Sequence, residues 1–327
     1  MKIALVRLDG IGDALACAPL VAALRDAGHD VGAVLEERSA EAFAPGAFSG
    51  VHRLERIPWP RHGSSLASRR AALRELRRAR YDIALVASEE LEAYRVARAA
   101  RIRRRVGFVN GWEKPLKTLR VRSLLTRALL RPASARRARE HEVETLFRLG
   151  AGLHGEPGPT RTLARLRPLV AGEPLSRHGM VALQAGSKFA GDGLDRTAFV
   201  AIARSLVARG RTVVILGDDA RFARSVADGA GVPCELGLEL PRWKALLAGA
   251  RAVVTADGGA AHVAGMCGVP CVDLFAAVPS AANDVVRWRP WASPARALVV
   301  GIAARGPDEL AALVARECDA VLAEASS

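Results

Sequence analysis

The stretch of residues 252–275, AVVTADGGAAHVAGMCGVPCVDLF, predicts a strand, a glycine turn, a helix and a second strand. The apolar run that starts at Ala252 stops at Asp257-Gly258-Gly259, small residues that let the backbone turn sharply and approach a ligand. Apolar residues at helical spacing follow, until Gly268 and Pro270 end the helix before the next buried strand. The backbone N–H groups of Gly258 and Gly259, at the start of this helix, form a natural cradle for a phosphate or diphosphate.

The same alternation of strand and helix occurs twice along the chain of 327 residues. It begins with the strand KIALVRL at residues 2–8 and restarts at residue 180, after a stretch at 150–179 in which Gly, Pro and Arg replace the apolar periodicity. Repeated βα units predict an α/β protein of two doubly wound, Rossmann-like domains that face each other across a cleft. We place the domains at residues 1–165 and 170–327; the last helix, 307–324, either stays with the second domain or packs back on the first.

The composition predicts a cytoplasmic protein. No apolar run approaches the ~18 residues that a membrane span requires, and the start MKIALVRLDG carries Arg7 and Asp9 where a secretory signal would be apolar. The five cysteines form no CxxC pair, which predicts reduced thiols in the core; they are Cys17, Cys234, Cys267, Cys271 and Cys318. We expect the chain in the cytoplasm, either free or at the cytoplasmic face of the inner membrane.

The net charge of +14 is concentrated in residues 95–139, which hold fifteen Arg and Lys residues against the single acid Glu113. Such a block predicts an anionic partner, namely a phosphorylated lipid, an acidic membrane surface or a nucleic acid. A general preference for arginine is the alternative, since arginines are also frequent at residues 69–78. Few aromatics lie among the basic residues, which disfavours stacking on single-stranded nucleic acid. We therefore expect no nucleic acid partner, and we assign acceptor binding to Arg103, Arg104 and Arg105.

Four loops rich in glycine and acidic residues follow predicted strands, where open α/β sheets bind their ligands. The loops are Gly10-Ile11-Gly12-Asp13, Gly186-Ser187-Lys188, Gly217-Asp218-Asp219 and Asp257-Gly258-Gly259. Asp13 is a helix N-cap worth ~1 kcal/mol, a carboxylate in the ligand crevice, or both. His262 either packs beneath the Asp257 turn or hydrogen-bonds a ligand, because no metal-ligand spacing surrounds it. The dinucleotide, phosphate-loop and serine-hydrolase motifs are absent from the sequence.

Three motifs resemble those of the glycosyltransferase family 9 heptosyltransferases, in the same order and over nearly the whole chain. They are RLDGIGD at residues 7–13 with Ala18-Pro19, REHEVE at 139–144 leading to Leu149-Gly150, and DGGAAH at 257–262 with Gly268-Val269-Pro270 and Leu274-Phe275. The resemblance implies a GT-B architecture and an inverting transfer of a heptose from ADP-heptose. It also implies a lipopolysaccharide inner-core acceptor at the cytoplasmic face of the inner membrane.

The resemblance also implies roles for single residues. Asp13 matches the general base, with Gly10 and Gly12 beside it on the acceptor side. On the donor side the resemblance implies Asp257, Gly259 and His262; Gly258 and the loop residues Gly186, Ser187, Lys188, Asp218 and Asp219 are further donor-binding candidates. An inverting transfer needs a carboxylate to take the acceptor proton, and N–H donors or cations to stabilise the departing diphosphate. Neither a metal nor a cofactor is then required, and the nucleotide sugar is a co-substrate.

Three departures from the family pattern fall on the donor side. Residues 189–194, FAGDGL, replace a Lys-x-Trp-Pro stretch, so Lys188 either supplies the charge from a different position or the charge is missing. Gly258 stands where the family has threonine, and Ala276 where it has glycine. The sequence therefore predicts an inverting glycosyltransferase for which ADP-heptose is the first donor candidate. The alternatives are a different donor sugar, or a catalytically degenerate protein that binds a nucleotide sugar.

Overall fold

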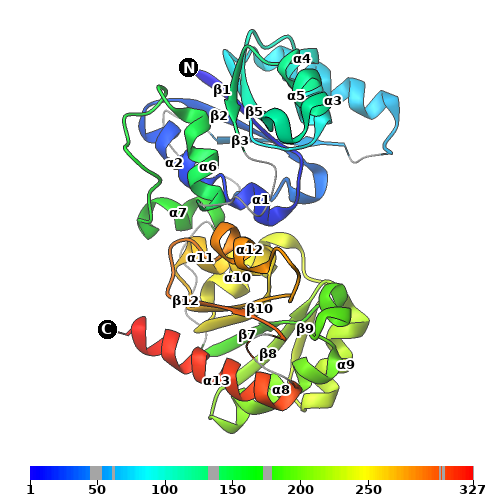
Figure 1. Cartoon of the computed structure of the whole chain (residues 1–327), viewed down its shortest axis with the longest axis vertical. Coiled ribbons are helices and arrows are strands. Elements are labelled where there is room, and N and C mark those ends of the chain that lie inside the picture. The colour runs from blue at the N-terminus through cyan, green and yellow to red at the C-terminus, as the bar shows by residue number, and fades with distance from the viewer. Residues whose placement is uncertain are drawn as a thin grey trace. The chain divides into compact units, whose positions relative to one another are not determined.

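The computed structural model describes residues 1–44, 54–60, 63–131, 140–171, 179–301, 303 and 306–326. The chain splits into two compact units, residues 1–172 and 173–327, called unit 1 and unit 2 below (Figure 1). Of the predicted basic segment, Arg136, Arg137 and Arg139 lie outside the described residues.

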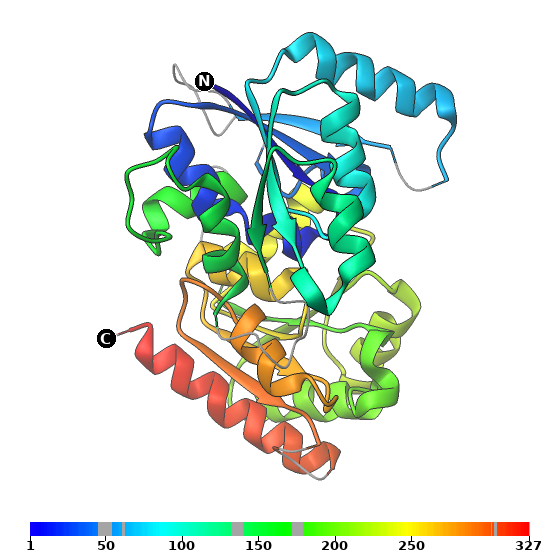
Figure 2. The same cartoon turned by 45° about the horizontal axis from the view of Figure 1, so that its top comes forward.

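Unit 1, within its described residues, contains a six-stranded parallel sheet in the order β3-β2-β1-β4-β5-β6. Its strands are β1 (Lys2–Arg7), β2 (Asp30–Glu36), β3 (Leu54–Trp59), β4 (Ile83–Val86), β5 (Arg104–Val109) and β6 (Arg127–Leu130). Its helices are α1 (Ile11–Leu15), α2 (Ala18–Asp26), α3 (Leu66–Ala79), α4 (Leu91–Ala99), α5 (Pro115–Arg122), α6 (Glu142–Phe147) and α7 (Leu163–Val170). Helices α3, α4 and α5 pack on one face of the sheet, and α2, α6 and α7 lie together on the other (Figure 2).

Unit 2 repeats this plan over residues 179–301, 303 and 306–326, with a parallel sheet in the order β12-β11-β10-β7-β8-β9. Its strands are β7 (Met180–Gln184), β8 (Thr212–Gly217), β9 (Cys234–Leu236), β10 (Ala252–Ala256), β11 (Cys271–Phe275) and β12 (Ala295–Val299). Its helices are α8 (Arg196–Ala208), α9 (Ala220–Ala230), α10 (Leu240–Gly249), α11 (Gly259–Cys267), α12 (Ala281–Trp288) and α13 (Pro307–Glu324). The predicted α/β class of two doubly wound, Rossmann-like units is confirmed.

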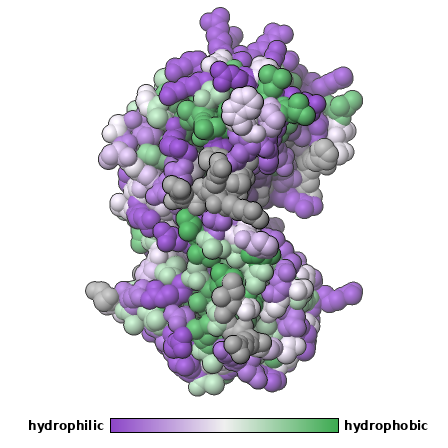
Figure 3. All heavy atoms as spheres, in the orientation of Figure 1, coloured by the Kyte–Doolittle hydropathy of each residue, from purple (hydrophilic) through white to green (hydrophobic). Residues whose placement is uncertain are grey.

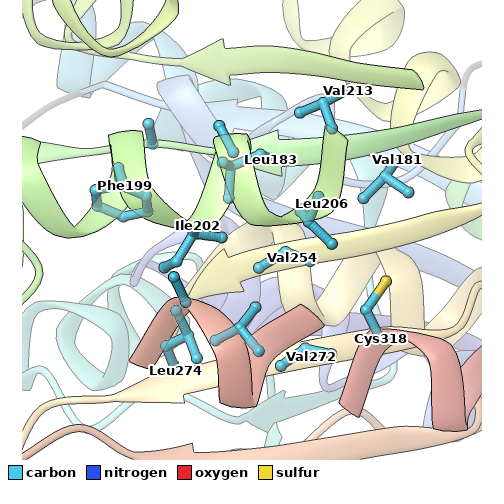
Figure 4. Packing of buried hydrophobic residues seen from close by; sticks show 14 of the residues in the cluster. Val181, Leu183, Phe199, Ile202, Leu206, Val213, Val254, Val272, Leu274 and Cys318 are labelled. Atoms are coloured by element: carbon cyan, nitrogen blue, oxygen red, sulfur yellow. The ribbon is translucent and has the colours of Figure 1, made fainter. Parts of the chain in front are cut away.

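A hydrophobic core of unit 2 lies between its sheet and two long helices. Phe199, Ile202 and Leu206 of α8 pack on the strands, and Cys318 of α13 lies in the same cluster (Figure 4). The sequence left open whether this last helix packs back on the first domain. In the structure its buried face contacts α8 and strands β10, β11 and β12 of unit 2.

Both sheets change winding direction at a defined pair of neighbouring strands. In unit 1 the first strand, β1, lies beside β4, and in unit 2 the first strand, β7, lies beside β10. Connections leave such a pair toward opposite edges of the sheet, so a crevice opens at the carboxyl ends of the two strands. The predicted loops at Gly10, Gly186 and Asp257 all follow these central strands directly.

The structure differs from the sequence expectation in three segments. The apolar residues Val106-Gly107-Phe108 predict a short strand, and β5 is longer than this because it starts at Arg104, which pairs with Ile83 of β4. The basic segment, expected to be irregular, contains α5 and β6. The stretch expected to be a linker contains α7, which packs on α2. Among the described residues, no helix is both long and apolar enough to cross a membrane.

Candidate active site

The carboxyl end of β1 places a buried arginine, Arg7, among acidic side chains. Its Nε lies 2.9 Å from Oδ2 of Asp9, and its Nη1 lies 3.5 Å from Oε1 of Glu142. Its Nη2 forms a short ion pair with Asp13 Oδ1, and its Nη1 donates to the carbonyl of Ala87 at the end of β4. One guanidinium therefore joins both strands of the winding switch to three carboxylates.

The local sequence explains how Asp13 reaches this arginine. Gly10 is the N-cap of the short helix α1, and its N–H donates to Asp13 Oδ2 at 3.2 Å. The two oxygens of Asp13 thus have different partners, the Arg7 guanidinium and a backbone N–H. Its side chain keeps 31% exposure while that of Arg7 has 3%. The N-cap expected at Asp13 is Gly10 instead, and Asp13 at the third helical position accepts from the N–H of that cap with a carboxylate that is fixed in position and partly open to solvent.

The charges around Arg7 do not contribute equally. Burial alone lowers the pKa of Arg7, but the carboxylates of Asp13, Asp9 and Glu142 outweigh it and raise the pKa above its usual value. Burial raises the pKa of Asp9, although Arg7 and a hydrogen bond with Ser88 act against it. Arg7 is therefore a permanent cation, and Asp13 is the most exposed of the three carboxylates beside it.

A second buried arginine continues the charge network on the far side of Glu142. Arg131, directly after β6, places Nη2 2.8 Å from Oε2 of Glu142 and 2.8 Å from Oε1 of Glu89. Its guanidinium also lies over the ring of Phe108, 5.6 Å from the centroid. Burial raises the pKa of Glu142, and the two arginines oppose that rise. The network therefore alternates in sign from Asp13 through Arg7, Glu142 and Arg131 to Glu89.

The start of α6 explains why a glutamate can be buried at position 142. His141 is the N-cap, and its Nδ1 accepts a hydrogen bond from the Val143 N–H at 3.1 Å. Glu144 reaches back to accept from the N–H of His141 at 2.9 Å, which completes a capping box. With the helix start fixed on both sides, Glu142 is held against the two arginines.

The three arginines assigned to acceptor binding lie elsewhere in unit 1. Arg104 pairs with Ile83 at the start of β4, so it lies at the amino edge of the parallel sheet, opposite to Asp13. Arg105 uses its guanidinium on backbone carbonyls, donating to Leu124 at 2.6 Å and to Ile102. The structure does not bring Arg103, Arg104 and Arg105 to the carboxyl edge, because they lie at the start of β5, which runs parallel to β4 and β1.

In unit 2, the donor motif follows β10 as predicted. Asp257 and Gly258 form the turn, Gly258 is the extended N-cap, and α11 begins at Gly259. His262 is buried one turn into α11, where its ring meets Trp288 edge to face at 5.7 Å between centroids. His262 therefore packs beneath the turn, and its hydrogen bond to a donor ligand stays a prediction.

The remaining donor-side residues meet at the ends of β7 and β8. Ser187 Oγ donates to Asp219 Oδ2 at 2.9 Å, and Asp219 caps α9 by accepting from the Phe222 N–H. These hydrogen bonds, that from Phe222 first, lower the pKa of Asp219. An added Cβ on Gly186 would lie 3.6 Å from Oδ1 of Asp218, so the two loops are neighbours. Lys188 places its Nζ over the ring of Phe189, 4.4 Å from the centroid.

Several buried charged residues were given no role by the sequence reasoning. In unit 1 they are Arg7, Arg131 and Glu142; in unit 2 they are Lys244 and Asp273. Asp273 is fully buried on β11, opposite Thr255 of β10, and neither carboxylate oxygen has a hydrogen bond within the described part of the chain. Burial and the charge of Asp257 raise the pKa of Asp273 well above its usual value. The sequence did carry a signal for Asp273, because it is a charged residue within an otherwise apolar strand.

The two units contain no cluster of three His, Cys, Asp or Glu side chains that could hold a metal ion, among the residues described. Around Arg7, the three carboxylates surround a guanidinium instead.

Comparison with known proteins places the fold. A family model, glycosyltransferase family 9 (heptosyltransferase), matches residues 69–309. A crystal structure of a family 9 glycosyltransferase from Veillonella parvula DSM 2008 is similar, with a TM-score of 0.74, 15% identity and coverage of 99% of this chain and 97% of that one. No curated protein matches the sequence significantly.

Two Escherichia coli structures also match. The ADP-heptose lps heptosyltransferase II has a TM-score of 0.71 and 19% identity, with 100% of both chains covered. The heptosyltransferase WaaC with ADP has a TM-score of 0.71 and 18% identity, over 99% of this chain and 100% of that one. The predicted GT-B architecture is therefore confirmed. Because the family model spans well over half of the sequence, the chain belongs to glycosyltransferase family 9, the heptosyltransferase family.

Proposed function

We propose that this glycosyltransferase carries out an inverting transfer of a heptose, or a related sugar, from a nucleotide diphosphate donor. ADP-heptose is the first candidate, and the acceptor is the lipopolysaccharide core or another glycolipid or glycan. One observation carries the proposal: Asp13, at the winding switch of unit 1, is open to solvent and fixed by the buried Arg7. Family membership and the solved WaaC complexes with ADP and ADP-2-deoxy-2-fluoro heptose support the choice of donor.

In this reaction Asp13 is the general base. Its carboxylate takes the proton of an acceptor hydroxyl while the hydroxyl oxygen attacks the anomeric carbon of the sugar. The bond from that carbon to the diphosphate oxygen breaks, the electron pair leaves with the diphosphate, and the configuration inverts. Arg7 and the Gly10 N–H hold the carboxylate so that attack does not wait for a side chain to reorient.

The leaving diphosphate needs hydrogen-bond donors on the unit 2 side. The start of α11, at Gly258 and Gly259, offers backbone N–H groups and the positive end of the helix dipole, which contributes ~0.3–1 kcal/mol. Lys188, in the loop after β7, is the candidate counter-charge. Its neighbour Ser187 is hydrogen-bonded to Asp219 and adds polar groups to this loop. We assign the donor to these loops, and no step in this proposal needs a metal or cofactor.

The test is a transfer assay with ADP-heptose and purified core glycolipid. Asp13→Asn should lower turnover by ~10²–10⁴-fold, the usual contribution of a general base, with the donor-induced rise in melting temperature unchanged. Asp228→Asn, an exposed position on α9, is the matched control and should keep full activity. An Asp13→Asn protein with most of its activity would exclude Asp13 as the base.

A different donor, or binding without transfer, is the second candidate. The stretch after Lys188 that departs from the family pattern favours it, because the departures fall on the donor side. A thermal-shift panel separates the outcomes, since a ligand at ~100 times its Kd stabilises a protein by ~2.7 kcal/mol. A rise in melting temperature with UDP, GDP or TDP sugars would identify a different donor, and the proposed mechanism would be unchanged. A response to ADP-heptose without turnover would indicate a degenerate member.

A glycolipid acceptor would bring the enzyme to a membrane surface. We propose that it acts in the cytoplasm as a peripheral protein at the inner membrane, held by unit 1. The arginine block of unit 1 supports this, although Arg131 and Arg105 must be removed from the count, because their guanidinium groups are used inside the fold.

A further inference from the structure

Unit 1 exposes four large apolar side chains close together in the chain. Trp112 is 95% exposed, Leu116 73%, Leu119 70% and Leu130 64%. Several large apolar side chains that are exposed to water in one region often mark an interaction surface. Figure 3 shows apolar residues among hydrophilic ones on the part of unit 1 that carries α5.

These side chains sit on a rigid support. Val121 and the half-buried Leu124 and Leu125 fix α5 and its end to the core, so Leu116 and Leu119, one turn apart, lie on the outward side of the helix. Thr118 Oγ1 donates to the carbonyl of Gly111 at 2.9 Å, which ties the Trp112 turn to α5.

Leu130 belongs to the same surface. A Cβ added to Gly111 would lie 3.0 Å from Leu130 Cδ1, so Leu130 is adjacent to the Trp112 turn. The four side chains are therefore presented together, and we call them, with the basic residues around them, the α5 surface.

Five basic residues lie in the same segment of the chain as the apolar ones. They are Lys114, Lys117, Arg120, Arg122 and Arg127, against Glu113 alone. Within the described residues, no carboxylate pairs with any of the five. Exposed Trp and Leu side chains among such cations are typical of protein faces that lie in the headgroup region of an anionic bilayer. Tryptophan in particular favours that boundary.

We propose that the α5 surface docks on a bilayer that contains anionic phospholipid, with Trp112, Leu116 and Leu119 entering the headgroup region. This docking would explain how the protein is held at the inner membrane. It rests on the proposed function only for its biological purpose. A symmetric contact with a second copy would place two sets of five cations against each other, which is unfavourable. A nucleic acid would find a single aromatic ring for stacking.

The test is co-sedimentation of the full chain with vesicles of phosphatidylglycerol and phosphatidylethanolamine that contain no glycolipid. The expected result is binding that salt weakens and that phosphatidylcholine vesicles do not give. Leu116→Ser with Leu119→Ser should lower the partition constant about tenfold. Leu66→Ser with Val207→Ser, which removes two exposed apolar groups elsewhere, is the matched control and should change nothing.

Three outcomes would overturn the proposal. They are no binding of the wild type to the anionic vesicles, an equal loss of vesicle binding in both double variants, and a dimer in solution that dissociates only in the variant at Leu116 and Leu119, called the α5 variant. Transfer to a water-soluble acceptor fragment is measured in parallel. It should be unaffected by the α5 variant, so failure of docking and failure of the proposed function are separate results. Melting temperatures of both variants confirm that their folds are intact.

Discussion

Glu142 and Arg131 form a buried ion pair in unit 1, with Oε2 of the glutamate 2.8 Å from Nη2 of the arginine. The other oxygen of Glu142 faces Arg7, the arginine that holds Asp13. Glu142 therefore compensates the charges of two guanidinium groups at once. Its removal should lower the stability of the protein, although Glu142 is not one of the reacting groups.

Glu142→Gln should destabilise the protein by ~3–5 kcal/mol, because it leaves two buried cations short of a partner. Denaturant unfolding of the full chain is the measurement. Glu140→Gln, which breaks the exposed pair between Glu140 and Arg148, is the matched control and should cost less than ~1 kcal/mol. Equal effects of the two substitutions would mean that the buried pair is not special.

Arg7→Lys should lower kcat of the proposed transfer by about a hundredfold and leave donor affinity unchanged. A single ammonium cannot reach Asp13, Asp9, Glu142 and the Ala87 carbonyl together, so the base loses its fixed position. Arg165→Lys is the control, since Arg165 also bridges two carboxylates, Asp26 and Glu156, but far from the site. A rise in KM with unchanged kcat would contradict a role in positioning the base.

Asp273 should make stability fall as pH rises. Burial, followed by the charge of Asp257, raises the pKa of Asp273 well above its usual 3.8. The folded protein thus keeps a proton that the unfolded chain releases. The stability is fully present below the unfolded-state pKa and is lost as pH rises through the folded-state pKa, by about 1.4 kcal/mol for each pH unit between the two pKa values. In Asp273→Asn this loss should disappear when unfolding free energy is measured against pH.

Asp319 provides a control of opposite sign. Burial raises its pKa, but hydrogen bonds from Arg211 and Arg209, both at 2.6 Å, outweigh burial and lower it. Its contribution should therefore be present above the unfolded-state pKa and be lost as pH falls. Asp319→Asn should reduce the loss of unfolding free energy as the pH falls. Asp273→Asn should reduce the loss of unfolding free energy as the pH rises. The same change in both variants would show that the two carboxylates are not distinguished.

Gly265→Ala should destabilise unit 2 by ~1–3 kcal/mol despite the helix preference of alanine. An added Cβ would lie 2.6 Å from the backbone nitrogen of Trp291, and backbone cannot move aside as a side chain can. Since α11 carries the donor motif at its start, donor affinity should fall as well. Gly158→Ala, where a Cβ meets nothing within 4 Å, is the control in thermal unfolding and should be near neutral.

Local sequence was sufficient for the architecture and for the loops at the strand ends. Glycine and acidic residues after apolar runs marked the ends of β1, β7, β8 and β10, because turns at strand ends have strong residue preferences. Asp13 and Asp257 were proposed as site residues in this way. Arg7 and Glu142 were not assigned roles, because their contact joins distant parts of the chain and neither residue is unusual in its own segment.

Charge counting failed for a related reason. Along the sequence, Arg105 and Arg131 look like any other member of the basic block. In the fold, one guanidinium binds the carbonyls of Leu124 and Ile102, and the other is shared by two glutamates. A sum of formal charges does not distinguish a cation available to a partner from one already used in the interior.

The position of α13 has a consequence for biosynthesis. Leu310, Val314 and Cys318 belong to the same core as α8 and the strands of unit 2, yet they are among the last described residues of the chain. During translation α8 would cover part of this apolar face, and the part that α13 covers would stay exposed until α13 had emerged from the ribosome. Unit 2 would therefore complete its folding only after α13 had been synthesised, and a chain that stopped before residue 307 would be a natural client for chaperones and proteases.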